Sequence, residues 1–205
     1  MPDTKITQLN RKILSCIEIY SLFTSDYKMN LHGRGISRAI KESQKSVSNK
    51  LVMLARMKLL KYESRGSLKN YSLNLNNTSL INVLTIAEEY KAAVFISSNF
   101  SFYDFFSKLR FIVRGSILVF GSYARGDFSD KSDLDVAIIG DYSKKKADDI
   151  LQMYPIKIRI NSFSRNSFIK GLAKKDKFML EILEHHIIIK GSSDVVEIFW
   201  GFYNG

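Results

Sequence analysis

The stretch VFGSYARGDFSDKSDLDVAIIG, residues 119–140, decides the fold class because it joins two predicted strands through a glycine turn. The first strand is the continuous apolar run SILVF at 116–120, which is typical of a buried strand and ends at Gly121. The residues YARG that follow indicate a turn into a helix, where glycine permits close backbone approach and N–H groups favour phosphate. We therefore expect Gly121 and Ser122 to bind a phosphate.

The second half of the stretch places two carboxylates on one side of the next strand. DLDVAII begins a strand after the polar loop DFSDKS, and residues i and i+2 of a strand point to the same side. Asp133 and Asp135 then lie together, and they repel each other unless a cation lies between them. Magnesium suits this donor set, because it takes the rest of its shell from water and substrate phosphates. The pattern predicts a site for a nucleoside triphosphate with magnesium, two ions being possible, and transfer of a nucleoside monophosphate.

The spacing of these residues resembles the signature of a known superfamily. Gly121-Ser122, ten further residues and Asp133-Leu134-Asp135 are similar to the motif of the polymerase-beta-like nucleotidyltransferases, especially the small prokaryotic members called minimal nucleotidyltransferases. The resemblance covers about residues 115–190 and implies an α+β domain with a mixed β-sheet flanked by helices. By this likeness, Gly121 and Ser122 hold the triphosphate, Asp133 and Asp135 hold the metal ions, and Arg125 steadies the loop or touches phosphate.

One strand departs from the pattern of that superfamily, whose active members usually carry a third carboxylate on a later strand. The matching segment is YPIKIRIN at 154–161, where isoleucines alternate with Lys157, Arg159 and Asn161 and no carboxylate appears. Lys157 or Arg159 could instead neutralise a phosphate, and Asn161 could be a weak ligand. Asp148 and Asp149 are expected to be solvated on a helix. A nucleotide-sensing regulator that keeps the fold without catalysis is therefore an alternative to an enzyme.

Most of the positive charge lies in the first third of the chain. Residues 1–76 contain 14 Lys and Arg against 5 Asp and Glu, whereas residues 77–205 contain 17 against 15. Apolar spacing predicts helices at 9–23, 35–42 and 43–60, the last capped by Ser43 and facing inward through Val47, Leu51 and Leu54. Residues 59–75 predict a β-hairpin around Arg65-Gly66. This order resembles a winged helix-turn-helix domain.

A winged helix suggests a nucleic-acid partner, because a helix with a polar free face can enter the major groove while the hairpin touches phosphates. DNA contact is expected from the last helix and the hairpin: Lys45, Ser48, Asn49, Lys50, Arg65 and Lys69. The same fold could instead serve protein contacts or simply present a solvated basic face.

The domain organisation predicted from these patterns has three parts. Residues 1–76 form the winged helix domain, residues 77–114 a helical connection and residues 115–205 the nucleotidyltransferase domain. The aromatic stripe of the connection is expected to be core or a subunit interface: Phe102, Phe105, Phe106 and Leu109. The final aromatics, Phe199, Trp200, Phe202 and Tyr203, are expected to pack in the core, with a homodimer contact left open.

The remaining sequence features favour a cytoplasmic protein. Cys16, the single cysteine, cannot form an intrachain disulfide and is expected to be buried in the first helix. No apolar run has the length needed to span a bilayer, so no membrane partner is expected. His185 and His186 are adjacent and lack a partner at ligand spacing, so both are expected at the surface or at a junction, and His32 has no expected role.

Overall fold

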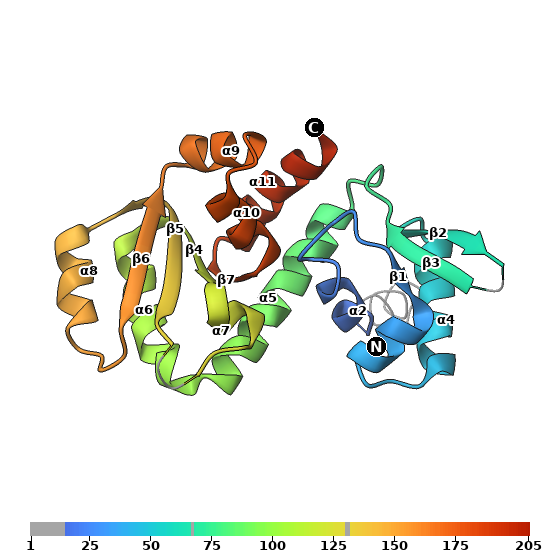
Figure 1. The fold of residues 1–205 in the computed structure, drawn as a ribbon, viewed down its shortest axis with the longest axis horizontal. Coiled ribbons are helices and arrows are strands. Elements are labelled where there is room, and N and C mark those ends of the chain that lie inside the picture. The colour runs from blue at the N-terminus through green and yellow to red at the C-terminus, as the bar shows by residue number, and fades with distance from the viewer. Residues whose placement is uncertain (1–14, 67, 130–131) are drawn as a thin grey trace, which may run out of the picture. The chain divides into compact units, whose positions relative to one another are not determined.

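The computed structural model describes residues 15–66, 68–129 and 132–205 (Figure 1). The chain divides into two compact units, Met1–Ala87 and Glu88–Gly205, and the division falls within the helix α5 (Leu80–Ser98). Of the first predicted helix, residues 9–14 lie outside the described residues, and α2 spans Ile17–Ser21. Cys16 is buried at the start of α2, as expected.

The first unit is built from short helices and a small antiparallel sheet. After α2 come β1 (Leu31–His32), α3 (Gly33–Ala39), α4 (Gln44–Arg56), β2 (Leu60–Arg65) and β3 (Leu68–Leu73). The sheet has the strand order β1-β3-β2, and both pairings are antiparallel. The predicted hairpin is therefore confirmed, whereas β1 was not predicted because two residues are too short to show an alternating pattern.

The helix α4 forms as its sequence predicts. The Ser43 hydroxyl accepts a hydrogen bond from the Ser46 amide at 3.3 Å and so caps the helix. Val47, Leu51 and Leu54 are all buried, so the inward face is confirmed. His32 also caps a helix, because its Nδ1 accepts from the Gly35 amide at 2.8 Å at the start of α3. The sequence had indicated no role for this histidine.

The connecting segment is helical, as expected. It consists of α5, the 3₁₀ turn η1 (Phe100–Phe102) and α6 (Tyr103–Ile112). Phe105, Phe106 and Leu109 are buried on α6, and Phe102 is buried just before it. The aromatic stripe is thus core, as predicted.

The second unit is a four-stranded mixed sheet with helices on both faces (Figure 1). Along the chain it contains β4 (Val113–Phe120), α7 (Gly121–Arg125), β5 (Leu134–Tyr142), α8 (Lys144–Leu151), β6 (Ile158–Phe163), α9 (Arg165–Ala173), α10 (Lys177–Glu184), β7 (His186–Lys190) and α11 (Ser192–Asn204). The strand order is β6-β5-β4-β7, with β5 and β6 parallel and the other pairs antiparallel. The predicted mixed sheet flanked by helices is confirmed.

The two faces of this sheet carry different helices. Ile117, Val119, Val136 and Ile138 belong to one core cluster with α6 and Ile150 of α8. The alternate residues face the other way: Phe163 of β6 contacts Phe168 of α9 and Phe178 of α10. The predicted core role of the tail holds for Phe199 and Tyr203 of α11, which are buried. None of the helices among the described residues has the length and apolar content to cross a membrane.

Candidate active site

The glycine turn and the second carboxylate meet at the end of β4. In the antiparallel pairing of β4 with β5, Phe120 lies opposite Asp135, so Gly121 follows directly beside that carboxylate. Gly121 has a φ of +69°, and a Cβ added there would lie 2.8 Å from Asp135 Oδ2. Glycine is favoured on both counts, because a side chain would strain the backbone and displace the Asp135 carboxylate. The structure thus brings together the two halves of the motif.

Asp133 directly precedes β5, Asp135 is its second residue, and both carboxylates face the Arg159 guanidinium, as their spacing predicts. Arg159 of β6 faces them, because β6 runs parallel to β5 and places Arg159 opposite Asp135. One nitrogen of its guanidinium pairs with Asp133 Oδ2, and the other lies 4.0 Å from Asp135 Oδ1. Lys157 Nζ adds a second contact to Asp133, at 3.3 Å. Two basic side chains therefore neutralise the carboxylate pair.

The electrostatics of Asp135 reflect this crowding. Burial raises the pKa of the Asp135 carboxyl above its ordinary value, Arg159 offsets part of that rise, and the neighbouring Asp133 carboxylate adds to it. The side chains of Asp133 and Asp135 are only 20% and 22% exposed, whereas those of Lys157 and Arg159 are 67% and 55% exposed. The two carboxylates are thus largely shielded from solvent, whereas the basic side chains of Lys157 and Arg159 approach them from the solvent side.

Arg125 steadies the turn through partners that the sequence did not reveal. Its Nε donates to Asp127 Oδ2 at 3.2 Å, and its Nη1 donates to Glu181 Oε1 of α10 at 3.0 Å. Glu181 also raises the pKa of Asp135, so its charge is felt at the carboxylate pair. The contact links α7 to α10 and brings a further acidic group to the side of the site.

The strand β6 carries no carboxylate at the position where the superfamily usually has its third. Arg159 occupies the register opposite Asp135, and the remaining residues of β6 are Ile158, Ile160, Asn161, Ser162 and Phe163. Asp148 and Asp149 are exposed on α8, as expected. Within the described ranges, no three or more His, Cys, Asp or Glu side chains are grouped so as to hold a metal ion.

The predicted nucleic-acid contacts of the first unit lie on the helix α4 and on the hairpin of β2 and β3. Lys45, Ser48 and Asn49 are exposed on α4, and Ser48 and Lys69 both line a hollow of about 360 Å³ between the start of α4 and β3. Lys50 differs, because its ammonium pairs with Glu42. The Lys69 ammonium lies 4.6 Å from the centre of the Tyr62 ring. Arg65 ends β2, and its side chain lies outside the described part of the chain.

A buried ion pair lies elsewhere in the second unit. His186 begins β7 at the junction with α10, as one of the two expectations had it, but it is buried instead of lying at the surface. His186 Nε2 lies 2.9 Å from Glu88 Oε1, its Nδ1 lies 2.8 Å from the Leu183 carbonyl oxygen, and both charged side chains have no exposed surface. Lys91 Nζ donates to the other Glu88 oxygen at 2.9 Å. His185 is exposed, as expected. No sequence signal links Glu88 to His186, because they lie on remote elements.

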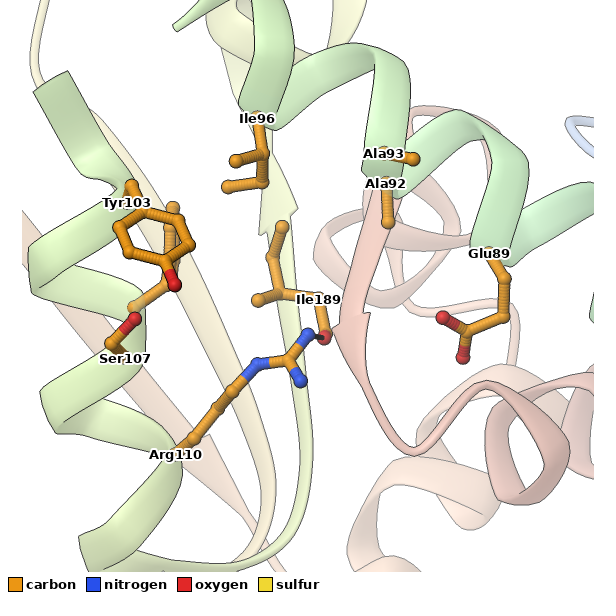
Figure 2. Close-up of a pocket in the computed structure, with 9 residues that line it drawn as sticks. Glu89, Ala92, Ala93, Ile96, Tyr103, Ser107, Arg110 and Ile189 are labelled. Carbon is orange, nitrogen blue, oxygen red and sulfur yellow. Dashed lines mark hydrogen bonds between the residues drawn. The ribbon is translucent and has the colours of Figure 1, made fainter. Parts of the chain in front are cut away.

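A separate hollow of about 330 Å³ lies between α5, α6 and β7. Figure 2 shows the residues that line it. The Arg110 guanidinium donates to the Ile189 carbonyl across it, and the Glu89 carboxylate lies on α5 at its far side. The other lining residues are Ala92, Ala93, Ile96, Tyr103, Phe106 and Ser107. None of the predicted site residues is among them, so this hollow is distinct from the carboxylate site.

Comparison with known proteins agrees with the geometry of the carboxylate site. Residues 104–200 match the family model described as "Nucleotidyltransferase domain". The chain is also similar to "Putative protein adenylyltransferase MJ0604" of Methanocaldococcus jannaschii, with 46% identity over 41 residues, which is 18% of this chain and 41% of that protein. No solved structure matches the chain. The family match and the relative together support the nucleotidyltransferase superfamily for the region 104–200.

Proposed function

We propose that the second unit binds a nucleoside triphosphate with magnesium and transfers its nucleoside monophosphate to an acceptor. One observation carries this proposal: the Gly121 turn lies against Asp135, so a phosphate-binding turn and a carboxylate pair share one site. The match of residues 104–200 to the nucleotidyltransferase domain supports the same class of reaction.

The donor set fits one magnesium ion bound together with its nucleotide. Asp133 and Asp135 supply oxygens that face the same guanidinium at the start of β5, and magnesium completes its shell with water and substrate phosphates. A second ion would lack the third carboxylate, because no residue of β6 carries one. Asp133 and Asp135 are therefore the residues that would hold the ion, which when bound neutralises charge on the phosphate oxygens.

The reaction proposed is attack of an acceptor oxygen on the α-phosphorus, with cleavage of the bond to the β-phosphate and departure of pyrophosphate. Gly121 lets the backbone approach the triphosphate closely, and Ser122 offers its hydroxyl and amide. Arg125 holds the turn in place through Asp127 and Glu181. Fixing the reacting groups in this way supplies much of the rate in phosphoryl-type transfers.

The name of the relative bears on the acceptor. It reads "Putative protein adenylyltransferase", which supports transfer of an adenylyl group to a protein acceptor in this chain as well. A nucleic acid or a small molecule as acceptor would be recognised in the same experiment by the nature of the labelled product.

The test is transfer of label from each α-labelled nucleoside triphosphate, with magnesium and a cell extract as the acceptor pool. The Asp133→Asn, Asp135→Asn double variant should move no label, whereas the wild type should. Asp148→Asn, Asp149→Asn is the matched control, because it removes the same charge from exposed positions on α8. Equal transfer by the wild type and the site variant would rule out the mechanism.

The lack of a carboxylate on β6 favours a second candidate, a DNA-binding regulator whose nucleotidyltransferase domain senses nucleotide without catalysis. We propose a winged helix for the first unit, supported by its element order and by its sheet order β1-β3-β2. Lys45 and Asn49 are exposed on α4, and Lys69 is exposed on β3 beside it. A groove-reading helix beside a basic hairpin is the arrangement that such a regulator needs.

This second candidate predicts DNA binding that depends on salt and on the lysines of the first unit. Lys45→Ala, Lys69→Ala should weaken duplex binding and reduce the slope of log affinity against log salt by about 0.9 for each phosphate that the variant no longer neutralises. Lys144→Ala, Lys145→Ala removes the same charge from exposed positions on α8 and should leave binding almost unchanged. Equal effects of the two double variants would exclude a specific DNA surface on the first unit.

A further inference from the structure

Arg159 and Lys157 occupy the solvent side of the carboxylate pair. The Arg159 fork reaches both carboxylates, and Lys157 Nζ lies 3.3 Å from Asp133 Oδ2. A divalent cation that enters this site without a nucleotide must displace the contact of Arg159 and that of Lys157 from Asp133. The two basic side chains and the metal ion therefore compete for the same oxygens.

The geometry allows these two side chains to move while the carboxylates stay in place. Lys157 and Arg159 are 67% and 55% exposed, so their stems can turn in solvent, whereas Asp133 and Asp135 are about one-fifth exposed beside a paired strand. A triphosphate bound at the Gly121 turn presents oxygens that both cations bind well, the guanidinium in bidentate fashion. The same side chains that cover the metal ligands are thus placed to bind the phosphates.

We propose that Arg159 and Lys157 are triphosphate-binding residues that keep divalent cations off Asp133 and Asp135 until the nucleotide draws them away. This inference rests on the proposed nucleotide site and adds an order of binding, in which the triphosphate binds first and thereby makes the metal ligands available. Binding linkage then requires that the nucleotide and the metal strengthen each other's affinity by the same factor.

A purely structural role for Arg159 makes a different prediction. If the guanidinium only relieved repulsion between Asp133 and Asp135, its removal would free the metal ligands and leave nucleotide affinity unchanged. The proposal requires opposite effects on the two ligands from one substitution. It also requires the coupling between them to decrease.

The experiment measures Mn²⁺ binding by electron paramagnetic resonance and binding of α,β-methylene-ATP by calorimetry, each with and without the other ligand. Without nucleotide, Arg159→Gln should bind Mn²⁺ about two- to fivefold more tightly, as expected for removal of an exposed ion pair. The same variant should bind the nucleotide analogue about tenfold more weakly, as expected for removal of a hydrogen bond between charged groups. Lys157→Gln should act in the same directions with smaller changes.

Lys145→Gln is the matched control, since it removes one exposed positive charge from α8 of the same unit. It should leave both affinities within about twofold, and circular dichroism should show all variants folded. Unchanged Mn²⁺ affinity in Arg159→Gln, or unchanged nucleotide affinity, would overturn the inference while leaving the proposed function standing. Failure of the wild type to bind any triphosphate analogue with Mn²⁺ would overturn both.

Discussion

The buried pair of Glu88 and His186 permits a quantitative prediction of stability. Glu88 has no exposed side-chain surface, and its carboxylate accepts from His186 Nε2 and from Lys91 Nζ. His186 also faces the Leu183 carbonyl with Nδ1. A carbonyl and an ionised carboxylate only accept hydrogen bonds, so the ring satisfies both by donating from each nitrogen as an imidazolium.

Glu88→Ala removes the acceptor of both cations. The exposed fraction of the Lys91 side chain is 18%, so this ammonium can turn to water, but His186 is left with a buried donor that has no partner. Removing one partner of a buried ion pair lowers the free energy of unfolding by about 3–5 kcal/mol, which is a large part of the roughly 5–15 kcal/mol that is usual for a domain. Glu88→Gln should cost less, because its amide can donate to Nε2 of a neutral ring while Nδ1–H still donates to Leu183.

Trp200 makes the measurement specific to the second unit. It is the single tryptophan of the chain and lies in α11, so urea unfolding followed by its fluorescence reports on that unit. With a urea dependence of about 1–3 kcal/mol per molar, Glu88→Ala should lower the midpoint by about 1 M or more. His185→Ala, at the exposed neighbouring position, should change stability by no more than about 0.5 kcal/mol. A destabilisation in Glu88→Ala of the same size as in this control would refute the reasoning.

The same pair and two other features of the second unit lead to three more expected outcomes. Burial raises the pKa of Glu88, but Lys91 and His186 outweigh the effect of burial and hold this pKa at about 2, below its ordinary 4.5. The stability that the pair contributes is therefore present above pH 4.5 and should be lost as the pH falls towards 2. This loss should occur in the wild type but not in Glu88→Ala. Gly121→Ala and Gly126→Ala both place a side chain at positive φ, and each should lower the free energy of unfolding in urea by about 1–2 kcal/mol. Only the side chain of Gly121→Ala contacts Asp135, so only this variant should abolish binding of a triphosphate analogue, measured by calorimetry. Phe105→Ala should cost about 3–5 kcal/mol in the Trp200 assay, whereas Phe111→Ala, at a position 91% exposed further along α6, should be nearly neutral; similar destabilisation in the two would contradict the assigned core.

The candidate site could be predicted where the signal was local. Asp133 and Asp135 share a side because strand residues alternate, and the turn at Gly121 follows from an apolar run that ends in glycine. The cap at Ser43 and the inward face of α4 are local in the same sense, since they depend on neighbours within a few residues.

The partners of the predicted residues could not be read in this way. The sequence placed Arg159 and Lys157 on one face of a strand, but which carboxylates they meet depends on the parallel register of β6 with β5. The link from Arg125 to Glu181 depends on the placement of α10. The burial of His186 was not predicted for the same reason, because its partner Glu88 lies on α5, far away in the chain.

The sequence by itself determined most of the elements, though not the short strand β1, together with the shared side of the two carboxylates, the glycine turn and the basic first third of the chain. These features follow from alternation, helical spacing, caps and charge, all of which act between close neighbours along the chain. Only the tertiary structure decided that Arg159 takes the register opposite Asp135, that Glu181 holds Arg125 and that Glu88 is buried with His186. Such pairs depend on strand order and on how helices cover the sheet, and no short-range pattern records which distant charge will lie opposite a given side chain.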